Sequence, residues 1–457
     1  MTQLPQPRLF GTDGMRGRAD EFPLDPKTLF RLGRVLGGML SATSGDTSSG
    51  ASPTVLLGGD TRESSPRIAT QLAAGLQEAG ARVTYAGVIT TPGIAHLTRH
   101  GNFQAGVMLS ASHNPYADNG VKIFSPQGMK IPDSLEEEIE EKLRNQKASP
   151  PKPSPSTLVP DTELLVSYVD HLAHLIPPGV EVSRLRLVAD CANGAASRLA
   201  PLVTEKLGLN CTFLNNHPDG ENINRDCGSL HPEKMARVVS EQGADLGVAF
   251  DGDADRAIFS TGKGRITHGD GILWVAARFL KSQGGLAENR VVGTVMTNYG
   301  LELALEREGI RLARTPVGDK YVLEEMLRSG ANLGGEPSGH LIFSDLSTAG
   351  DGLVSLLMTL RIMAESGRSL EDLVRELKLL PHVIQNIPVK NQPPLESVEP
   401  IQQALARSEE RLRERGRILV RYSGTEPLLR VMVEANDEEV VREITDEMVR
   451  VIRKHLA

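Results

Sequence analysis

The chain has 457 residues, of which 39% are hydrophobic and 24% charged, and its formal net charge at pH 7 is −8. This composition is typical of a soluble globular protein with about three or four domains. The negative charge excludes a general attraction to nucleic acid or to anionic membranes, so a bound anion would need a local cluster of Arg and Lys.

Cysteine usage and hydropathy predict a cytoplasmic protein. The three cysteines, Cys191, Cys211 and Cys227, form no CxxC pair and leave an odd count, which suits a reducing compartment. The N-terminus lacks the pattern of a signal peptide, and no apolar run approaches the roughly 18 residues of a membrane span.

Short apolar runs alternate with helix-period segments along most of the chain, which predicts α/β units around mainly parallel sheets. Strand-like openings begin at Thr54, Arg186 and Arg290. Each is followed later by a second strand with an unusual loop; these loops read SASHNP, DGDADR and GEPSGH. The pattern indicates one architectural unit used three times, with ligands beyond the carboxyl ends of the strands.

Changes in composition divide the chain further. A Pro/Ser-rich stretch at 145–157 reads as a linker, and the character changes again near residue 380, where a helix, a hairpin and a terminal helix follow. The prediction is an α/β protein with three similar domains, whose sheets are mixed but mainly parallel, and a smaller α+β domain. The expected domains are 1–157, 158–262, 263–379 and 380–457.

The first glycine-rich segment, FGTDGMRG at 10–17, places Thr12, Asp13 and Arg16 between glycines, which is a weak signal by itself.

The segment SASHNP carries Ser112. Ser, Asn and Pro are ordinary turn residues, and spacing alone favours a turn. The functional alternative is an exposed hydroxyl that carries a phosphoryl group beside His113 and Lys122.

Three carboxylates, Asp251, Asp253 and Asp255, follow an apolar strand. They repel one another strongly unless they are solvated or neutralised, and a hard divalent cation with oxygen ligands is the usual partner. An EF-hand is excluded because Arg256 and Gly262 stand where that loop needs Gly and Glu. Mg²⁺ is the prediction, and a solvated acidic turn is the alternative.

Two further loops carry polar groups suited to a sugar phosphate. GGEPSGH offers Glu336, Ser338 and His340, whose polar groups suit sugar hydroxyls, but such loops are common. RYSGTEP lies at a hairpin turn and predicts a phosphate-binding loop, with a bare turn as the alternative. Its candidate residues are Arg421, Ser423, Gly424, Thr425 and Arg430.

Taken together and in order, FGTDGMRG, SASHNP, DGDADR, GEPSGH and RYSGTEP resemble the motifs of the α-D-phosphohexomutase superfamily over nearly the whole chain. The resemblance implies four domains around a central cleft. It also implies that Ser112 is the phosphoserine and that its phosphate, with Asp251, Asp253 and Asp255, holds one Mg²⁺ per chain.

The resemblance assigns the remaining candidates by position. It implies that Glu336 and Ser338 contact sugar hydroxyls, and that the RYSGTEP segment with Arg430 binds the non-reacting phosphate. The candidates for proton transfer and charge stabilisation are Arg16, Lys122, Arg256 and His340. Which of them is the acid or base stays open, as does whether His113 contributes chemistry or only holds its turn.

Within the superfamily the chain is similar to the bacterial branch that acts on glucosamine phosphates. The similar segments are FGTDGMRG, GENINRDCGSLHPE at 220–233 and RTPVGDKYV at 314–322. Pro337 departs from that branch, whose sugar loop usually has Gln there, and this leaves the choice of sugar open.

This resemblance implies interconversion of glucosamine 6-phosphate and glucosamine 1-phosphate through a 1,6-bisphosphate, which also acts as activator, for UDP-N-acetylglucosamine and peptidoglycan-precursor synthesis. The alternatives are a mutase for mannose or glucose phosphates, a Mg²⁺-dependent sugar phosphatase and a sugar-phosphate sensor. A hinge near residue 380 is expected, and neither nucleic acid nor membrane is an expected partner. The oligomeric state is open, with a homodimer as one expectation.

Overall fold

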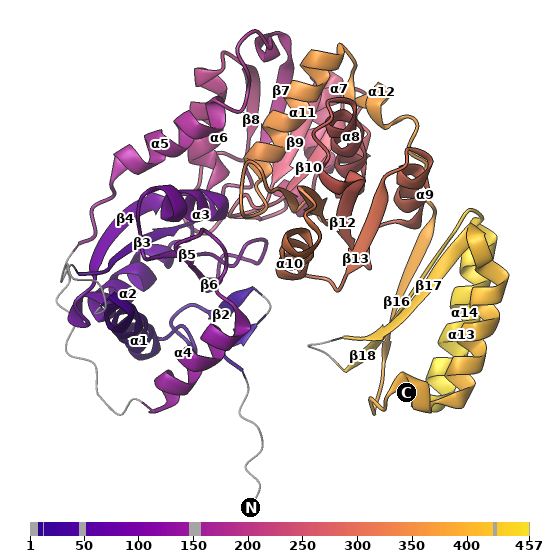
Figure 1. Ribbon diagram of the computed structural model, residues 1–457, viewed down its shortest axis with the longest axis horizontal. Coiled ribbons are helices and arrows are strands. Elements are labelled where there is room, and N and C mark those ends of the chain that lie inside the picture. Colours follow the sequence, from indigo (N-terminus) through magenta and orange to yellow (C-terminus); the bar gives the residue numbers. More distant parts are fainter. Residues whose placement is uncertain (1–7, 12, 45–51, 146–156, 424–426, 457) are drawn as a thin grey trace, which may run out of the picture. The chain divides into compact units, whose positions relative to one another are not determined.

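The computed structural model describes residues 8–11, 13–44, 52–145, 157–423 and 427–456 (Figure 1). Its strands form four sheets, three of them in α/β domains and the last in a smaller C-terminal domain, as the sequence predicts. By contacts, the chain divides into two compact units, one of residues 1–296 and 312–375 and the other of residues 297–311 and 376–457. Within the described residues, no helix is both long and apolar enough to cross a membrane.

The first sheet has six strands in the order β1-β2-β6-β5-β3-β4. Strands β3, β4 and β5 run parallel, and β6 returns antiparallel to β5. The strand β5, AGVML, is buried along its whole length, because a central strand covered on both faces needs apolar residues at every position. The strands are β1 Phe10–Gly11, β2 Gly14–Arg18, β3 Thr54–Gly59, β4 Arg82–Val88, β5 Ala105–Leu109 and β6 Asp118–Phe124.

The second and third sheets repeat this plan with fewer strands, in the orders β11-β10-β9-β7-β8 and β13-β12-β14-β15. In each, a parallel strand is followed by an antiparallel return, β9 to β10 and β14 to β15. The strands are β7 Arg186–Asp190, β8 Asn210–Leu214, β9 Leu246–Phe250, β10 Ala257–Thr261, β11 Ile266–Thr267, β12 Arg290–Thr294, β13 Arg311–Thr315, β14 Leu333–Gly335 and β15 Leu341–Phe343.

The three loops with unusual sequences occupy equivalent positions in these sheets. SASHNP lies between β5 and β6, DGDADR between β9 and β10, and EPSGH between β14 and β15. This equivalence confirms the repeated unit that the sequence indicated. It also means that each loop follows the carboxyl end of a buried strand, where side chains can gather around a ligand.

Helices cover the faces of these sheets (Figure 1). The helix α3 shows how the sequence determines where a helix begins. The Thr90 hydroxyl accepts a hydrogen bond from the Gly93 N–H, and Pro92 lies in the first turn. The helices of the first unit are α1 Pro26–Ser44, α2 Ser65–Glu78, α3 Thr91–His100, α4 Asp133–Asn145, α5 Thr162–Ala173, α6 Ala196–Lys206, α7 Glu233–Gln242, α8 Gly269–Ser282, α10 Asp319–Ser329, α11 Gly352–Ser366 and α12 Leu370–Val374.

In the first domain, α1 and α2 pack very closely on each other. A Cβ added at Gly75 of α2 would lie 2.0 Å from the Phe30 carbonyl oxygen of α1. A Cβ added at Gly33 of α1 would lie 2.2 Å from the Leu72 carbonyl oxygen of α2. Glycine at both positions therefore allows the two backbones to approach, and the helices together cover part of the first core.

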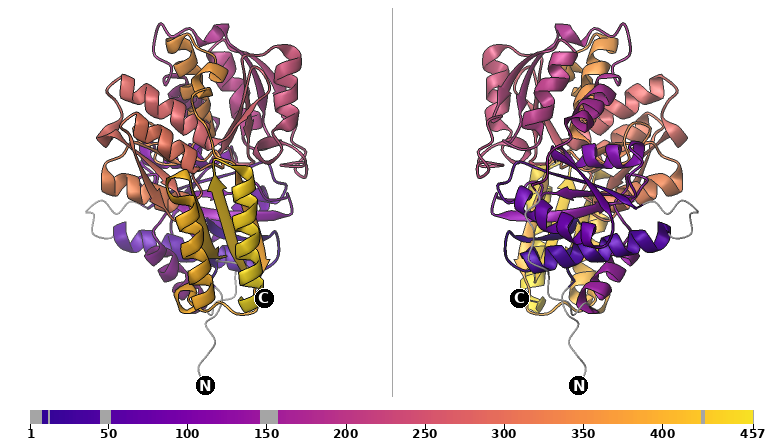
Figure 2. Two further views of the ribbon diagram at one scale, coloured as in Figure 1. Left: turned by 90° about the vertical axis from the view of Figure 1, so that its right-hand side faces the viewer. Right: turned by 90° about the vertical axis from the view of Figure 1, so that its left-hand side faces the viewer.

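The second unit contains an antiparallel sheet, β16-β18-β17, with two helices packed on it (Figure 2). Buried residues in the terminal helix recur every three or four positions, which gives it one apolar face. The elements are β16 His382–Pro388, α13 Glu399–Leu412, β17 Gly416–Tyr422, β18 Leu428–Ala435 and α14 Glu438–Leu456.

A segment from the middle of the chain belongs to this second unit. The helix α9, Tyr299–Arg307, lies within residues 297–311. The Tyr299 N–H donates to Glu434 Oε2 over 3.2 Å, and the Asn298 side chain exchanges two hydrogen bonds with the backbone of Leu380. The domain range 263–379 predicted from the sequence includes this segment, and these contacts connect it to residues far along the chain.

Candidate active site

The Ser112 turn follows β5 in a conformation that a serine rarely adopts. Its φ is 51°, in the left-handed region, and the residue is completely buried. The Ser112 carbonyl accepts from Arg62 Nη2 over 3.1 Å and from Asn224 Nδ2 over 2.9 Å, while its N–H donates to Ser110 Oγ over 2.9 Å. A strained backbone persists only where its surroundings hold it, so these contacts keep Ser112 in position.

The Ser112 hydroxyl points at the acidic loop of the second domain. Ser112 Oγ donates to Asp251 Oδ2 over 2.6 Å. The prediction of an exposed hydroxyl was wrong, because the turn folds the side chain in against that loop. A buried hydroxyl loses its hydrogen bonds to water, and Asp251 replaces them.

His113 is a neutral hydrogen-bond acceptor in this arrangement. Its Nδ1 lies 3.2 Å from Arg256 Nη1, which can only donate, and 3.3 Å from Ser112 Oγ. Burial, followed by the charges of Arg256 and Arg16, lowers the pKa of His113 to about 4. The ring therefore orients Arg256 beside the serine.

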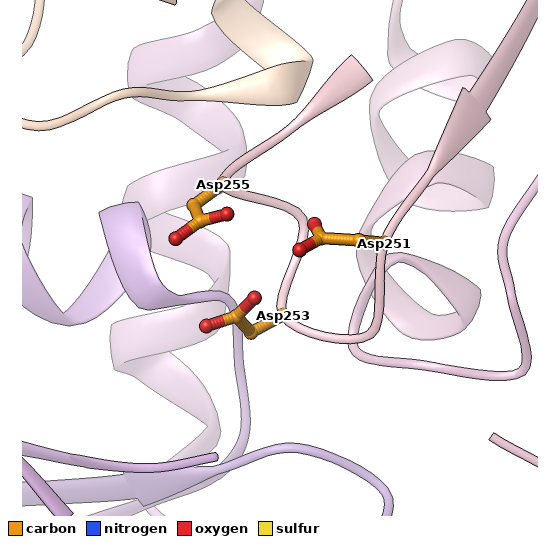
Figure 3. Close-up of side chains that lie close together, drawn as sticks. All are labelled: Asp251, Asp253 and Asp255. Atoms are coloured by element: carbon orange, nitrogen blue, oxygen red, sulfur yellow. The ribbon is translucent and has the colours of Figure 1, made fainter. Parts of the chain in front are cut away.

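The three aspartates of DGDADR converge in one buried cluster (Figure 3). One oxygen from each of Asp251, Asp253 and Asp255 lies within 4.8 Å of the others. Asp253 Oδ1 and Asp255 Oδ1 are buried without a hydrogen-bond partner. Burial, followed by the charges of Asp255 and Asp253, raises the pKa of Asp251 well above its usual range. A divalent cation would satisfy these oxygens and remove the repulsion, so the cluster fits a metal site.

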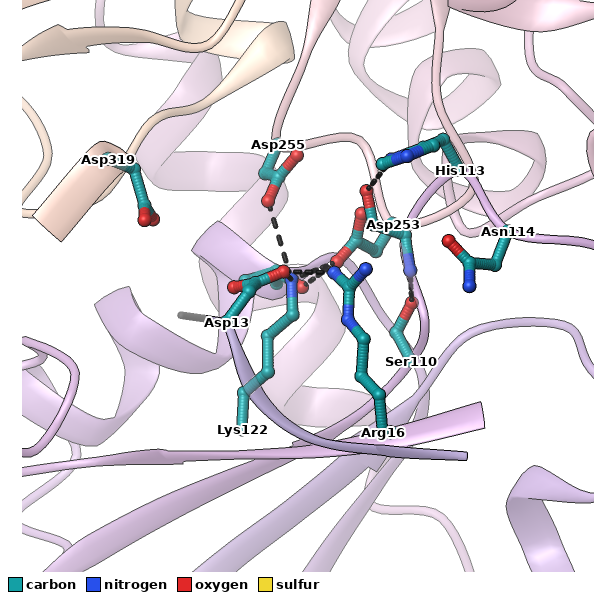
Figure 4. A network of polar contacts seen from close by, with 12 residues as sticks. Asp13, Arg16, Ser110, His113, Asn114, Lys122, Asp253, Asp255 and Asp319 are labelled. Carbon is teal, nitrogen blue, oxygen red and sulfur yellow. Dashed lines mark hydrogen bonds and ion pairs between the residues drawn. The ribbon is translucent and has the colours of Figure 1, made fainter. Parts of the chain in front are cut away.

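Lys122, on β6, provides the positive charge nearest to this cluster (Figure 4). Its ammonium lies 2.9 Å from Asp253 Oδ2, 3.5 Å from Asp255 Oδ2 and 3.1 Å from Asp13 Oδ2. Burial alone would lower the pKa of Lys122, but the three carboxylates outweigh it and hold the pKa well above the usual range. The Lys122 ammonium is therefore surrounded by carboxylates from two domains.

A chain of ion pairs extends this cluster toward the third domain. Asp13 pairs with Arg16, Lys122 and Lys130, and Lys130 Nζ also lies 2.6 Å from Asp319 Oδ2 at the start of α10. Burial would raise the pKa of Asp13, but Lys122, Lys130 and Arg16 hold it far below the usual range. These contacts place the FGTDGMRG segment and the third domain around the same charges.

The third loop is held against the turn that carries Asp319. Glu336 Oε1 accepts from the Gly318 N–H over 3.0 Å, and Glu336 Oε2 accepts from Ser338 Oγ over 3.3 Å. Gly339 has a φ of 89°, and a Cβ there would lie 2.3 Å from the Ala257 carbonyl oxygen. The glycine thus lets the third loop pack directly on the strand that follows the aspartates.

His340 connects the third loop to the acidic cluster. Its Nδ1 lies 3.8 Å from Asp255 Oδ1 and its Nε2 3.7 Å from Asp319 Oδ2. Burial would lower the pKa of His340, but Asp255, Asp319 and Glu336 raise it. His340 Nε2 is buried without a hydrogen-bond partner, and a ring that titrates there can exchange a proton with a bound group.

The second unit contains a separate set of phosphate-binding candidates. Arg421 of β17 and Arg430 of β18 are directly opposite each other in the antiparallel register. Like charges in this position repel, and burial, followed by the charge of Arg430, lowers the pKa of Arg421. An anion held by both guanidinium groups would relieve the repulsion. Ser423, two positions after Arg421, is buried. Gly424 and Thr425 lie outside the described residues.

Sequence reasoning missed several residues that build the site. Arg62, Thr91 and Lys130 were not singled out, and Asn224 and Asp319 appeared only inside segments noted for their resemblance. Thr91 supports the acidic loop, since its N–H and hydroxyl donate to the carbonyl and the carboxylate of Asp253. The segments GENINRD and PVGDKYV contained a usable signal, because they resemble a known branch without matching any of the loops assigned a role.

Comparison with known proteins agrees with this fold and indicates an isomerase that transfers phosphoryl groups. Four domain families of phosphoglucomutase/phosphomannomutase match: α/β/α domain I at residues 7–149, domain II at 166–264, domain III at 268–379 and the C-terminal domain at 385–451. The chain therefore belongs to the phosphoglucomutase/phosphomannomutase family.

Individual relatives are similar to this chain in sequence over nearly their whole length. A protein of Koribacter versatilis is 47% identical over 95% of this chain and 94% of its own length, and one of Solibacter usitatus is 46% identical over 98% and 99%. Both are named phosphoglucosamine mutase.

Solved structures share the fold at lower identity. A phosphoglucomutase/phosphomannomutase family protein of Burkholderia thailandensis matches with a TM-score of 0.79 and 23% identity, over 98% of this chain and 97% of that one. The N-acetylphosphoglucosamine mutase of Aspergillus fumigatus matches with a TM-score of 0.64 and 18% identity, over 98% and 95%.

Proposed function

We propose that this protein interconverts glucosamine 6-phosphate and glucosamine 1-phosphate through a phosphorylated Ser112 and a bound glucosamine 1,6-bisphosphate, and so supplies UDP-N-acetylglucosamine and peptidoglycan-precursor synthesis. The observation that carries the proposal is the Ser112 hydroxyl, held 2.6 Å from Asp251 within a buried acidic cluster. The near-full-length relatives named phosphoglucosamine mutase support the choice of sugar.

The metal of this proposal is Mg²⁺. Asp251, Asp253 and Asp255 would hold it together with a phosphate oxygen on Ser112, and the unpartnered carboxylate oxygens in the cluster support that ligand set. A bound Mg²⁺ neutralises charge on the transferring phosphoryl group.

The chain's own residues position the reacting groups. The oxygen of the sugar's C1 hydroxyl forms a bond to phosphorus as the bond from Ser112 Oγ breaks. The hydroxyl loses its proton to His340, and the departing Ser112 Oγ takes up a proton from solvent. After the bisphosphate turns over, Ser112 Oγ returns that proton to solvent as it accepts the phosphoryl group from C6, and His340 gives its proton to the C6 oxygen. Arg16, Lys122 and Arg256 stay charged throughout and stabilise the transferring group.

Recognition of the sugar falls to the third domain in this proposal. Glu336 and Ser338 bind hydroxyl groups, and Asp319 binds the ammonium group that distinguishes glucosamine from glucose and mannose. Among Asp13, Asp319 and Glu336, the site carboxylates outside the metal cluster, Asp13 is paired with three cations and Glu336 accepts two hydrogen bonds. Asp319 is paired with Lys130 and lies 3.7 Å from His340 Nε2, so it has fewer cationic partners than Asp13, and we assign the ammonium group to it.

The non-reacting phosphate is assigned to the second unit. Arg421, Ser423, Gly424, Thr425 and Arg430 would bind it, and the opposed pair of arginines supports this role. The four-domain division at 157/158, 262/263 and 379/380 belongs to the same proposal, and the four matched family ranges support it.

The test compares turnover of glucosamine, glucose and mannose 6-phosphates with Mg²⁺ and a catalytic amount of the matching 1,6-bisphosphate. We expect glucosamine 6-phosphate to give the highest kcat/KM and its 1-phosphate to be the product. Dominant activity on mannose or glucose 6-phosphate would reject the sugar assignment and keep the mutase. Release of inorganic phosphate in place of an isomerised sugar would indicate a phosphatase.

A further inference from the structure

The acidic loop, DGDADR at 251–256, is held by the first turns of two helices. The Thr91 N–H, the first of α3, donates to the Asp253 carbonyl oxygen over 3.0 Å. The Gly352 N–H, the first of α11, donates to the Ala254 carbonyl oxygen over 3.0 Å. The first N–H groups of a helix have no partner within that helix. Both helices therefore use this free donor to bind the backbone of the acidic loop.

The backbone of Ala254 needs such support. Its φ is 56°, in the left-handed region, and a strained backbone persists only where its surroundings hold it. A Cβ added at Gly352 would lie 3.0 Å from the Ala254 carbonyl oxygen and 2.9 Å from the Arg256 carbonyl oxygen. The helix α11 thus begins directly against the loop. Because Ala254 stands between Asp253 and Asp255, a shift of α11 would move both carboxylates.

The N-cap residues of these two helices meet at one tyrosine. Thr90 caps α3, where its hydroxyl oxygen accepts from the Gly93 N–H. Asp351 caps α11, where its Oδ1 accepts from two N–H groups of the first turn. The hydroxyl of Tyr168, on α5, donates to Asp351 Oδ2 over 2.5 Å and is also hydrogen-bonded to the Thr90 side chain. A single hydroxyl group therefore connects both caps.

The environment of Tyr168 suits this role. The side chain is buried, and a Cβ added at Gly93 would lie 3.0 Å from Tyr168 Cε1, so the glycine lets the ring approach the first turn of α3. Burial, followed by the charge of Asp351, raises the pKa of Tyr168 well above its usual range. The phenol therefore keeps its proton and donates it to Asp351, which leaves its oxygen to accept from the Thr90 hydroxyl.

We propose that Tyr168 is a positioning residue for the acidic loop, because its hydroxyl joins the N-caps of the two helices that hold the loop backbone. The helix α5 packs on both α3 and α11, and the three helices come from the first, second and third α/β domains. Tyr168 acts on the loop through Thr91 and Gly352. That a fixed loop binds Mg²⁺ more tightly rests on the proposed function.

The segment before α11 also packs on His340. A Cβ added at Gly350 would lie 2.2 Å from His340 Nε2, so the backbone of this segment contacts the imidazole ring. The Asp351 N–H donates to the Leu341 carbonyl oxygen over 3.3 Å, next to His340 in the third loop. Movement of the α11 cap would therefore displace His340 together with the acidic loop. Loss of the Tyr168 hydroxyl should lower kcat and leave KM for the sugar phosphate unchanged.

Hydrogen–deuterium exchange of the metal-free full chain tests the positioning role directly. The N–H groups of Ala254 and Arg256 both donate to Asp251, so their exchange reports on the acidic loop. Tyr168→Phe removes only the hydroxyl oxygen, and it should speed exchange in a peptide spanning residues 251–256 and in the first turns of α3 and α11. Tyr85→Phe, at a β4 tyrosine that packs on the first hydrophobic core, is the matched control and should leave that peptide unchanged. Exchange that rises equally throughout the first unit would overturn the proposal, because it would show a loss of stability without positioning.

Calorimetric titration with Mn²⁺ measures the consequence for the metal site. We expect about three- to tenfold weaker binding in Tyr168→Phe, as for the loss of one hydrogen bond, and no change in Tyr85→Phe. Asp351→Asn keeps an oxygen to cap α11 but puts an NH₂ group in place of one carboxylate oxygen. If the two residues act through one hydrogen bond, the double variant should bind Mn²⁺ no more weakly than the weaker single variant.

The outcomes separate this proposal from the proposed function. Wild-type Mn²⁺ affinity in Tyr168→Phe, or losses that simply add in the double variant, would overturn the role of Tyr168 and leave the mutase reaction intact. Absence of Mn²⁺ binding in the wild type would instead contradict the proposed Mg²⁺ site, and exchange in the metal-free protein would still decide the role of Tyr168. Circular dichroism checks that each variant is folded.

Discussion

At the scale of single residues, each buried charge of the site is stabilised by opposite charges around it. Lys122 is completely buried and keeps its proton because three carboxylates surround it, and Asp13 stays ionised because three cations surround it. Removing one partner of a buried pair leaves the other charge uncompensated, which costs about 3–5 kcal/mol. Substitutions within this group therefore perturb folding as well as chemistry, and informative variants lie at its edge.

Ser112→Ala should abolish mutase activity and remove one phosphate from the intact protein. The variant deletes only the hydroxyl oxygen, so the turn held by Arg62 and Asn224 should remain. Intact-mass spectrometry and the isomerisation assay measure the two effects. Ser125→Ala, in the same domain, serves as the control and should change neither. A fully active Ser112→Ala protein would contradict a phosphoserine mechanism.

Asp319→Asn should reduce kcat/KM for glucosamine 6-phosphate by about 10- to 100-fold more than for glucose 6-phosphate, since a hydrogen bond to a charged group contributes roughly 1.5–3 kcal/mol. The ratio is the informative quantity, because losing the charge also lowers the pKa of His340 and so affects both sugars.

Asp133→Asn is the control for this prediction. Asp133 pairs with Lys320, the neighbour of Asp319, but its side chain is 55% exposed. It should therefore leave the ratio unchanged. If Asp319→Asn lowers kcat/KM for both sugars equally, Asp319 does not recognise the ammonium group.

At the scale of elements, the recurring hairpins decide where chemistry is placed. Each of the three loops joins a buried parallel strand to an antiparallel return, so its side chains start from a rigid base. The helices contribute at their first turns: α3 supplies Thr91 to Asp253, and the turn before α10 supplies the Gly318 N–H to Glu336. Rigid elements on both sides of each loop keep the reacting groups aligned.

The crossing of α1 and α2 permits a direct test of close helix packing. Gly75→Ala should destabilise the protein by about 1–3 kcal/mol, because the added methyl group meets backbone atoms that cannot rotate away. Gly38→Ala in α1 is the matched control, since a Cβ there meets nothing within 4 Å. It should be neutral or stabilising by up to about 1 kcal/mol, as alanine favours helix. Denaturant unfolding measures both, and equal effects would contradict the packing argument.

At the scale of the whole molecule, the two units are joined at three points of the chain, between 296 and 297, 311 and 312, and 375 and 376. The sequence predicted one hinge near residue 380. A relative movement of the units would have to flex all three connections together.

Binding of sugar phosphate should make the molecule more compact if this movement closes the site. We expect a smaller radius of gyration by small-angle X-ray scattering when glucosamine 6-phosphate and Mg²⁺ are added. Glucosamine without phosphate is the control and should have no effect, because it cannot engage Arg421 and Arg430. Identical scattering with and without sugar phosphate would argue against closure.

The fold class and the three principal loops could be predicted because each signal is local. A buried strand and its loop lie within about a dozen residues, and the carboxylates of DGDADR are adjacent in sequence. The pairing of Lys130 with Asp319 could not be predicted, because the two residues are 189 positions apart and each resembles an ordinary surface charge. The exposure of Ser112 was predicted wrongly for a related reason, since the loop that buries it lies in another domain.

The position of α9 bears on how the protein is made. Residues 297–311 leave the ribosome well before Glu434 and Leu380, which provide their hydrogen bonds. Domains usually fold as they are synthesised, but these hydrogen-bond partners of the segment are made only when nearly the entire chain is complete. A nascent chain that stalls before β18 would carry α9 without its partner Glu434, and a chaperone or protease could recognise it. Recognition of α9 would then distinguish incomplete chains from complete ones.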